Sequence, residues 1–300
     1  MLTDWLVSIE GTPEGAHAAM ALALSAAIAH AVFGALQKGR HDPWLSRGAI
    51  DVFMALFALP VALFVVPWPE GRAWAILAGV IPIHFVYKLL MALAYERAAY
   101  TVVYPVVRGS GPLATVAFAA VAFQEHYGWL QWFGALGLSG GILGLALYNL
   151  RNLPGDLRRV RAGLAIALAA GLSVAVYTTY DAYGIRATPD PFTFLAWFFV
   201  VSSLDFPLIA LWRYGRMGDP PALGPLVGRG VAGALVAFVS FGAVMLATRL
   251  DKVGEAAVLR ETSVVFAALI GWFFLRDPVG PIRAGLILLI ALGAVLVEFG

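Results

Sequence analysis

The stretches YPVVRGSGP (104–112) and EAAVLRETSVV (255–265) each carry one arginine inside a largely apolar span. The two residues, Arg108 and Arg260, stand 152 positions apart. A charge inside hydrocarbon is costly, so it usually faces a cavity or a partner and marks a path for a ligand or an ion. Two such charges at matching places predict a transporter built from two related halves.

The same ungapped offset aligns an acidic turn and several glycines. The aligned pairs are Glu125 with Asp277, Gly128 with Gly280, and Gly141 with Gly293. Few other residues are identical at this offset, so the predicted repeat depends on the arginine and the acidic turn.

The composition indicates a multi-pass membrane protein. Hydrophobic residues make up 61% of the chain and charged residues 13%, with a mean hydropathy of +0.84. A soluble protein with buried helices would need long polar faces, which the apolar segments lack. We expect ten membrane spans, at residues 16–37, 49–66, 73–95, 98–123, 127–148, 162–184, 191–212, 230–248, 251–274 and 281–298.

The distribution of lysine and arginine predicts the orientation. Thirteen of these residues lie in the loops that follow odd-numbered spans, and four lie in the other loops. Because cytoplasmic loops carry the excess of positive charge, we expect both termini to be non-cytoplasmic, in a protein of the plasma (inner) membrane.

A basic loop divides the spans into five and five. We expect a polar N-terminal segment (1–15), a first five-helix repeat (16–148), the basic connecting loop (149–161) and a second five-helix repeat (162–300). An odd number of spans per half makes the second half enter the membrane with opposite orientation, as an inverted repeat.

Residues 102–145 and 256–296 each run as a helix, a short acidic turn and a glycine-rich helix. In these blocks the chain resembles the drug/metabolite transporter superfamily, and within it the EamA-type ten-helix exporters, especially those of amino acids and metabolites. The resemblance covers all ten spans in pattern. It implies an all-α integral membrane protein with ten helices around a central cavity, the fourth and ninth spans at its wall and the fifth and tenth as scaffold.

The fourth span has one polar face. Residues spaced three and four apart place on it Thr101, Tyr104, Arg108, Gly111 and Thr115. We expect Arg108 to meet either a substrate carboxylate or an internal acid, with Tyr104 orienting the substrate. In the ninth span Glu261 follows Arg260 directly, so it should point about 100° away and should not neutralise it. We expect Arg260 to join the halves or seal a gate, with Glu255 as another possible counter-ion.

Polar and aromatic residues also share a face in the third span. His84, Tyr87 and Lys88 lie on this face, which we expect to contribute substrate contacts opposite the fourth span. The alternative is that Lys88 extends to a lipid headgroup and His84 only packs.

Three further spans offer titratable groups. In the sixth, Tyr177 and Asp181 would suit an ammonium group. The alternative is that Tyr180 and Tyr183 form an interfacial aromatic belt and Asp181 caps the helix near water. In the seventh, Asp205 could pair with an arginine, and in the first His30 could carry a coupled proton. Cations and carboxylates together favour a zwitterionic substrate over a simple cation.

The predicted function is a secondary transporter that exports small zwitterionic or amphipathic metabolites, foremost amino acids, by alternating access. Multidrug or organic-cation efflux by proton antiport is the alternative, although the first span has no carboxylate between Ala16 and Gln37. A different class would be a non-transporting membrane scaffold.

An enzyme is not expected, because the five histidines are scattered and no nucleophile–base pair or clustered metal site is evident. We expect no catalytic residues, no metal and no cofactor. We also expect no nucleic-acid partner, because the net charge is only +2. The partners are a small molecule and the lipid bilayer. The sequence leaves open the substrate, the coupling ion, whether the protein is a monomer or a homodimer, and which arginine contacts the ligand.

Overall fold

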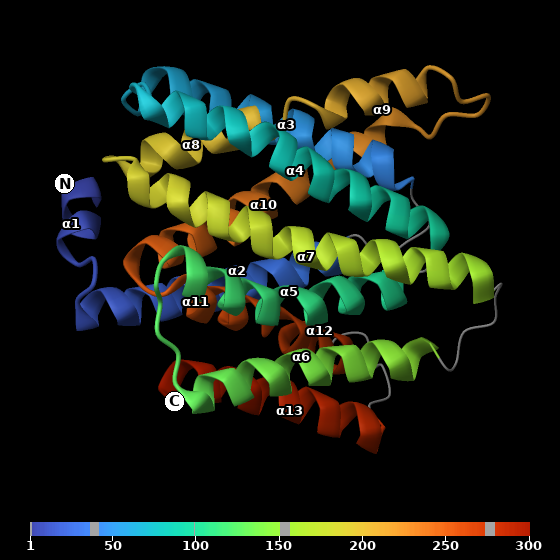
Figure 1. Cartoon of the computed structure of the whole chain (residues 1–300). Coiled ribbons are helices and arrows are strands. Elements are labelled where there is room, and N and C mark those ends of the chain that lie inside the picture. Colours follow the sequence, from blue (N-terminus) through green and yellow to red (C-terminus); the bar gives the residue numbers. More distant parts are fainter. Residues whose placement is uncertain (1, 37–41, 99, 151–156, 274–279) are drawn as a thin grey trace.

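The computed structural model describes residues 2–36, 42–98, 100–150, 157–273 and 280–300. All regular elements in these ranges are helices (Figure 1). They are α1 (Leu2–Ser8), α2 (Pro13–Leu36), α3 (Pro43–Phe64), α4 (Arg72–Arg97), α5 (Tyr100–Ala122), α6 (Trp129–Leu150), α7 (Leu157–Ala187), α8 (Pro191–Val201), α9 (Phe206–Tyr214), α10 (Leu223–Leu250), α11 (Val253–Glu261), α12 (Ser263–Phe273) and α13 (Pro281–Phe299). Asp277 and residues 151–156 of the basic connecting loop lie outside the described ranges.

Within the described ranges, nine helical segments are long and apolar enough to cross a membrane. They match nine of the ten expected spans. The expected span 251–274 is instead divided into α11 and α12 at Thr262, whose amide bonds to the Leu259 carbonyl at 3.0 Å. This i→i+3 bond tightens the end of α11, so a regular helix does not continue across the position.

Two aspartate–proline pairs define helix starts. Asp42 accepts from the amides of Trp44 and Leu45 ahead of Pro43, and Asp190 caps α8 ahead of Pro191 in the same way. Such caps satisfy amides that have no partner inside the helix, and proline suits the first helical position.

The first half of the chain packs helix by helix against the second. α2 contacts α10, α4 contacts α7, α3 contacts α8 and α9, and α6 contacts α13. α6 and α13 form one edge of the bundle, α3, α4, α8 and α9 form the opposite side, and the remaining long helices lie between (Figure 1). The first span thus packs on the eighth and the third on the sixth, a reciprocal pairing that the predicted inverted repeat would also produce. Both termini lie at the same end of the bundle.

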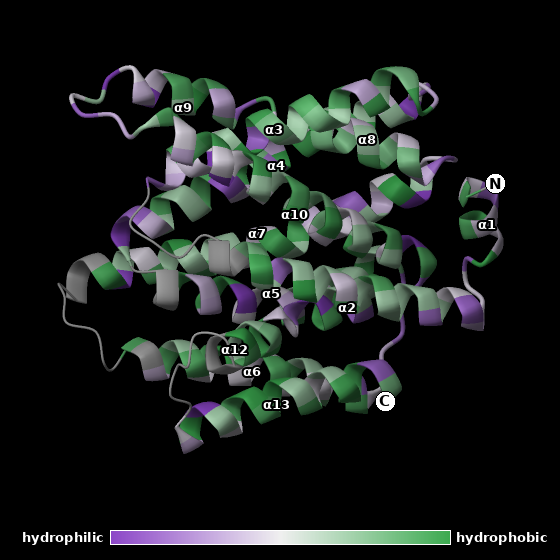
Figure 2. Ribbon diagram, turned by 180° about the vertical axis from the view of Figure 1, so that it is seen from behind, coloured by the Kyte–Doolittle hydropathy of each residue, from purple (hydrophilic) through white to green (hydrophobic). Residues whose placement is uncertain are grey.

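The surface is apolar where a membrane would contact it. Hydrophobic residues cover the outer faces of the helices, and hydrophilic ones gather at helix ends and in connections (Figure 2). Phe64, Val121 and Leu211 are among the exposed large side chains, at 83%, 76% and 71% exposure. In lipid this exposure costs nothing, because hydrocarbon solvates these groups as well as a protein core does.

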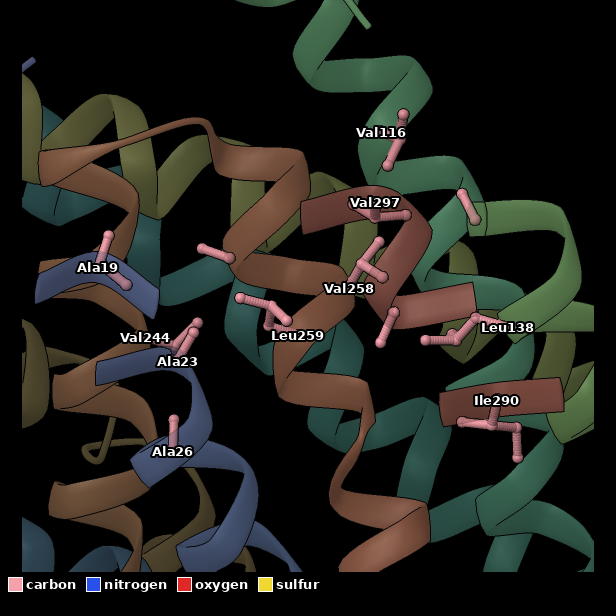
Figure 3. Close-up of a cluster of buried hydrophobic side chains, with 14 of the residues drawn as sticks. Ala19, Ala23, Ala26, Val116, Leu138, Val244, Val258, Leu259, Ile290 and Val297 are labelled. Carbon is pink, nitrogen blue, oxygen red and sulfur yellow. The ribbon is translucent and has the colours of Figure 1, made fainter. Parts of the chain in front are cut away.

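The short helix α11 lies in the centre of the packing. Its residues Val258 and Leu259 are buried between the alanines of α2 on one side and Leu138 and Ile290 on the other (Figure 3). This packing fixes the two charged residues that follow, Arg260 and Glu261, inside the bundle.

Candidate functional site

Buried ions from both halves meet at the end of α11. Nη1 of Arg108 lies 2.9 Å from Oε1 of Glu261, and Nη2 of Arg260 lies 3.2 Å from the same oxygen. All three side chains are at most 4% exposed. We call Arg108, Arg260, Glu261 and His30 the arginine cluster. In this cluster the Glu261 carboxylate forms ion pairs with both guanidinium groups.

The pairing corrects one sequence prediction. Glu261 was expected to point away from Arg260, but the Nε atom of Arg260 also donates to it at 3.3 Å. The regular helix ends at this position, with Thr262 as the C-cap residue, so the spacing of an uninterrupted helix does not apply. Arg108 meets an internal acid, which was one of its two expected partners.

His30 connects the arginine cluster to α10. Nη2 of Arg108 donates to Nε2 of His30, and Nδ1 of His30 lies 3.1 Å from the Ser240 hydroxyl. Because arginine has no acceptor, Nε2 must be unprotonated and the imidazole proton is on Nδ1. The Tyr104 ring stacks on His30 at 6.1 Å and lies 5.4 Å from the guanidinium carbon of Arg108.

A narrow cavity adjoins this cluster between α7, α10 and α11. Its lining residues are Tyr177, Thr178, Asp181, Phe241, Val244, Met245, Thr248 and Arg260. Three of the expected site residues, Tyr177, Asp181 and Arg260, therefore come together. The space open to the centre of a water molecule is about 10 Å³, which is close to what one water requires.

The cavity wall has polar groups with spare hydrogen-bonding capacity. The hydroxyls of Tyr177 and Thr178 are buried and have no hydrogen-bond partner among the described residues. A buried hydroxyl without a partner is costly, so these two atoms are suited to meet water or a ligand.

His84 reaches the cavity only through Asp181. Its Nε2 atom lies 2.9 Å and 3.1 Å from the two carboxylate oxygens, and both residues are buried. Rings of Tyr177 and Phe198 pack on His84 at 4.9 and 5.0 Å, and Tyr87 packs on Tyr177 at 4.9 Å. His84 thus contacts Asp181, and Tyr87 packs on Tyr177, and neither His84 nor Tyr87 lines the cavity.

Lys88 does not line the cavity, and its partners differ from those of His84. Its Nζ atom lies 2.9 Å from Asp51 and donates to Asp205 and, at 2.6 Å, to the Ser202 carbonyl. We call Lys88, Asp51 and Asp205 the lysine cluster. His84 and Lys88 were expected to face the same site, but Lys88 points toward α3 and the break between α8 and α9. Asp205 pairs with this lysine and not with an arginine.

Glu255 lies apart from both clusters. It pairs with Lys252 at 2.8 Å and accepts from the Gln131 amide at 2.7 Å. Sequence reasoning also missed Asp51, which is fully buried. A lone carboxylate inside an apolar span is the signal that could have identified it.

In the described residues no group of three or more histidine or acidic side chains is arranged to hold a metal ion.

An apolar helical bundle with buried charges beside a cavity is typical of multi-pass membrane transporters. Residues 161–299, just under half of the chain, match the EamA-like transporter family.

A solved crystal structure, described only as that of a protein, has the same fold. It superposes with a TM-score of 0.76 at 18% sequence identity, over 94% of this chain and 98% of the other. A comparison with curated proteins returned no match.

Proposed function

We propose that the protein exports small zwitterionic metabolites, with amino acids as the substrate class, by alternating access. The observation that carries this proposal is the pair of opposite charges on one narrow cavity, Arg260 on α11 and Asp181 on α7. A ligand with a carboxylate and an ammonium group would satisfy both without a net change of buried charge.

The two ends of the cavity suggest how such a ligand is oriented. The Arg260 guanidinium would bind the carboxylate, since it forms strong charge-assisted hydrogen bonds. Asp181 and the ring of Tyr177 would hold the ammonium group through charge and cation–π attraction. Phe241, with Val244 and Met245, would contact the substrate's own side chain.

The remaining expected site residues would act indirectly. Arg108 binds Glu261, so it would limit how far that carboxylate neutralises Arg260. His84 would orient Asp181, and Tyr104 would support Arg108. The lysine cluster would hold the broken seventh span, and His30 remains a candidate for a coupled proton.

Alternating access requires the cavity to open to each side in turn. The cavity lies between α7, α10 and α11 of the second half, close to Arg108 and His84 of the first half, so rocking of one half against the other would change access to it. With the lysine and arginine bias, export would run from the face bearing the basic loops to the face bearing both termini.

The proposal is tested by amino-acid counterflow in proteoliposomes containing purified protein. Competitors that carry both charged groups are compared with an N-acetyl amino acid, which lacks the ammonium, and with an amine, which lacks the carboxylate. We expect saturable counterflow that only zwitterions inhibit. Arg260→Gln and Asp181→Asn should abolish it, and the exposed control Arg216→Gln should not.

Other outcomes identify the alternatives. Inhibition by the amine alone, with activity retained in Arg260→Gln, would favour organic-cation efflux. Folded protein that exchanges neither amino acids nor organic cations would favour a scaffold.

A further inference from the structure

A polar network joins the two halves at the end of the bundle where α7 and α10 end and α11 begins. It consists of Glu125 and Tyr127 from the α5–α6 connection, Arg186 at the end of α7, and the amides of Val253 and Gly254. We call this set the clasp. None of its residues belongs to the site described above.

Glu125 holds the start of α11. Its Oε1 atom accepts from the Val253 amide at 2.9 Å, and its Oε2 atom accepts from the Gly254 amide at 3.5 Å. First-turn amides have no partner inside their own helix and carry partial positive charge, so a carboxylate binds them strongly. The connection between two first-half helices thereby caps a second-half helix.

Tyr127 adds a second link between the same segments. Its hydroxyl accepts from the Gly254 amide at 3.0 Å and donates to Glu125. Burial, followed by its bond to Glu125, raises the pKa of Tyr127 well above the usual value, so the phenol keeps the proton that it donates. Lys252 also lies 5.5 Å from the Tyr127 ring.

Arg186 ties this cap to α10. Its guanidinium lies 3.4 Å from Glu125, and it donates to the carbonyls of Thr248 at 2.8 Å and Asp251 at 2.7 Å. These carbonyls end α10, where a helix favours a cation. The clasp therefore fixes the beginning of α11 to the ends of α7 and α10 and to the first half.

The position of the clasp relates it to the cavity. Thr248 lines the cavity with its side chain while its carbonyl accepts from Arg186. Arg260 lines the same cavity, about two turns along α11 from the capped amides. The clasp thus adjoins the cavity through Thr248, which lines the cavity and accepts from Arg186.

We propose that the clasp is the gate that closes the substrate cavity at this end, and that its cross-half bonds from Glu125 must break for the cavity to open there. This inference rests on the proposed transport function but is tested without any substrate. Rocking of the halves would separate Glu125 from Val253, Gly254 and Arg186 together, since all three lie in the second half.

The test is thiol accessibility, for which the chain is well suited because it contains no cysteine. Val244→Cys places a single reporter on the cavity wall. Glu70→Cys, in the exposed connection between α3 and α4 at the same end of the bundle, identifies which membrane face a membrane-impermeant thiol reagent reaches. Labelling rates are measured in sealed vesicles of both orientations.

With the clasp intact we expect slow labelling of the Val244→Cys reporter from the Glu70→Cys face. Glu125→Gln and Arg186→Gln should each raise that rate on the order of tenfold, because each weakens hydrogen bonds to a charged group. Tyr127→Phe keeps the ring and should give a smaller increase. The matched control Asp190→Asn removes a carboxylate charge at the same end but no clasp bond, and should leave the rate unchanged.

Unchanged rates in folded clasp variants would overturn the proposal, and so would an equal increase in Asp190→Asn, which would show general loosening of this end. If the glutamine variants do not fold, Tyr127→Phe decides by the same comparison. Because labelling needs no substrate, a failure here is distinct from the absence of amino-acid counterflow, which would count against the proposed function.

Discussion

The carboxylate of Glu261 accepts from Arg108 at 2.9 Å, which joins α11 of the second half to α5 of the first through two side chains that are at most 4% exposed. The same oxygen also accepts from Arg260. The arrangement leaves one carboxylate to balance two buried guanidinium groups, so the stability of the interface between the halves depends on it.

Glu261→Gln should therefore be strongly destabilising. Removing one partner of a buried ion pair typically costs about 3–5 kcal/mol, because the other charge is left uncompensated. We expect a large fall in the midpoint of thermal unfolding, followed in detergent by the fluorescence of the nine tryptophans. The double variant Arg108→Gln/Glu261→Gln should recover part of the loss, and Glu70→Gln, on an exposed connection, should change little. A Glu261→Gln protein as stable as the wild type would contradict the buried pair.

The two arginines should respond differently to substitution. Arg108 donates to both Glu261 and His30 and does not line the cavity, whereas Arg260 does. We expect Arg108→Gln to lose stability, and Arg260→Gln to lose counterflow with a smaller stability loss. Unfolding midpoints and initial counterflow rates measured on the same preparations separate the two effects. The opposite pattern would place the ligand contact at Arg108, for which the sequence had offered a substrate carboxylate as one of two partners.

The lysine cluster predicts a second stability effect that is independent of transport chemistry. Lys88 is the shared partner of Asp51 and Asp205, and its Nζ atom also satisfies the Ser202 carbonyl at the helix break. Lys88→Met should cost about 3 kcal/mol, since it leaves Asp205 without its cation, whereas Asp51 keeps its ion pair with Arg47. Adding Asp205→Asn should recover part of the loss. A Lys88→Met protein of normal stability that fails only in counterflow would instead support the substrate contact that the sequence suggested.

Hydropathy and spacing predicted most of the fold, because length and apolar content are local properties. Nine spans appear close to the expected bounds. The break at Thr262 was not predicted, since no proline or glycine marks it. Three successive polar residues, Glu261, Thr262 and Ser263, are the local signal, and Glu261 pairs with Arg108 of α5, which lies far away in the sequence.

For the candidate site, the sequence indicated which buried polar residues to consider but not which of them contact each other. The spacing of His84 and Lys88 placed both on one face, yet they turn to different neighbours, α7 and α3. A helical face covers a wide arc, and which neighbour each side chain meets is set by tertiary packing that periodicity does not encode. The clasp was missed for the same reason, because Glu125 acts on backbone amides of a distant helix.

Close packing of α6 on α13 gives the last prediction. A Cβ atom on Gly134 would lie 2.6 Å from the backbone oxygen of Gly293, whereas nothing lies within 4 Å of a Cβ atom on Gly140. Both glycines lie in the fifth span, yet their surroundings differ sharply. Gly134→Ala should push the helices apart and cost about 1–3 kcal/mol, the usual effect of overpacking. Gly140→Ala, the matched control, should unfold within a degree or two of the wild type, since its methyl group meets only open space and alanine favours helix. Tryptophan-monitored unfolding of the two variants compares them directly, and equal midpoints would mean that α6 and α13 are not in close contact at Gly134.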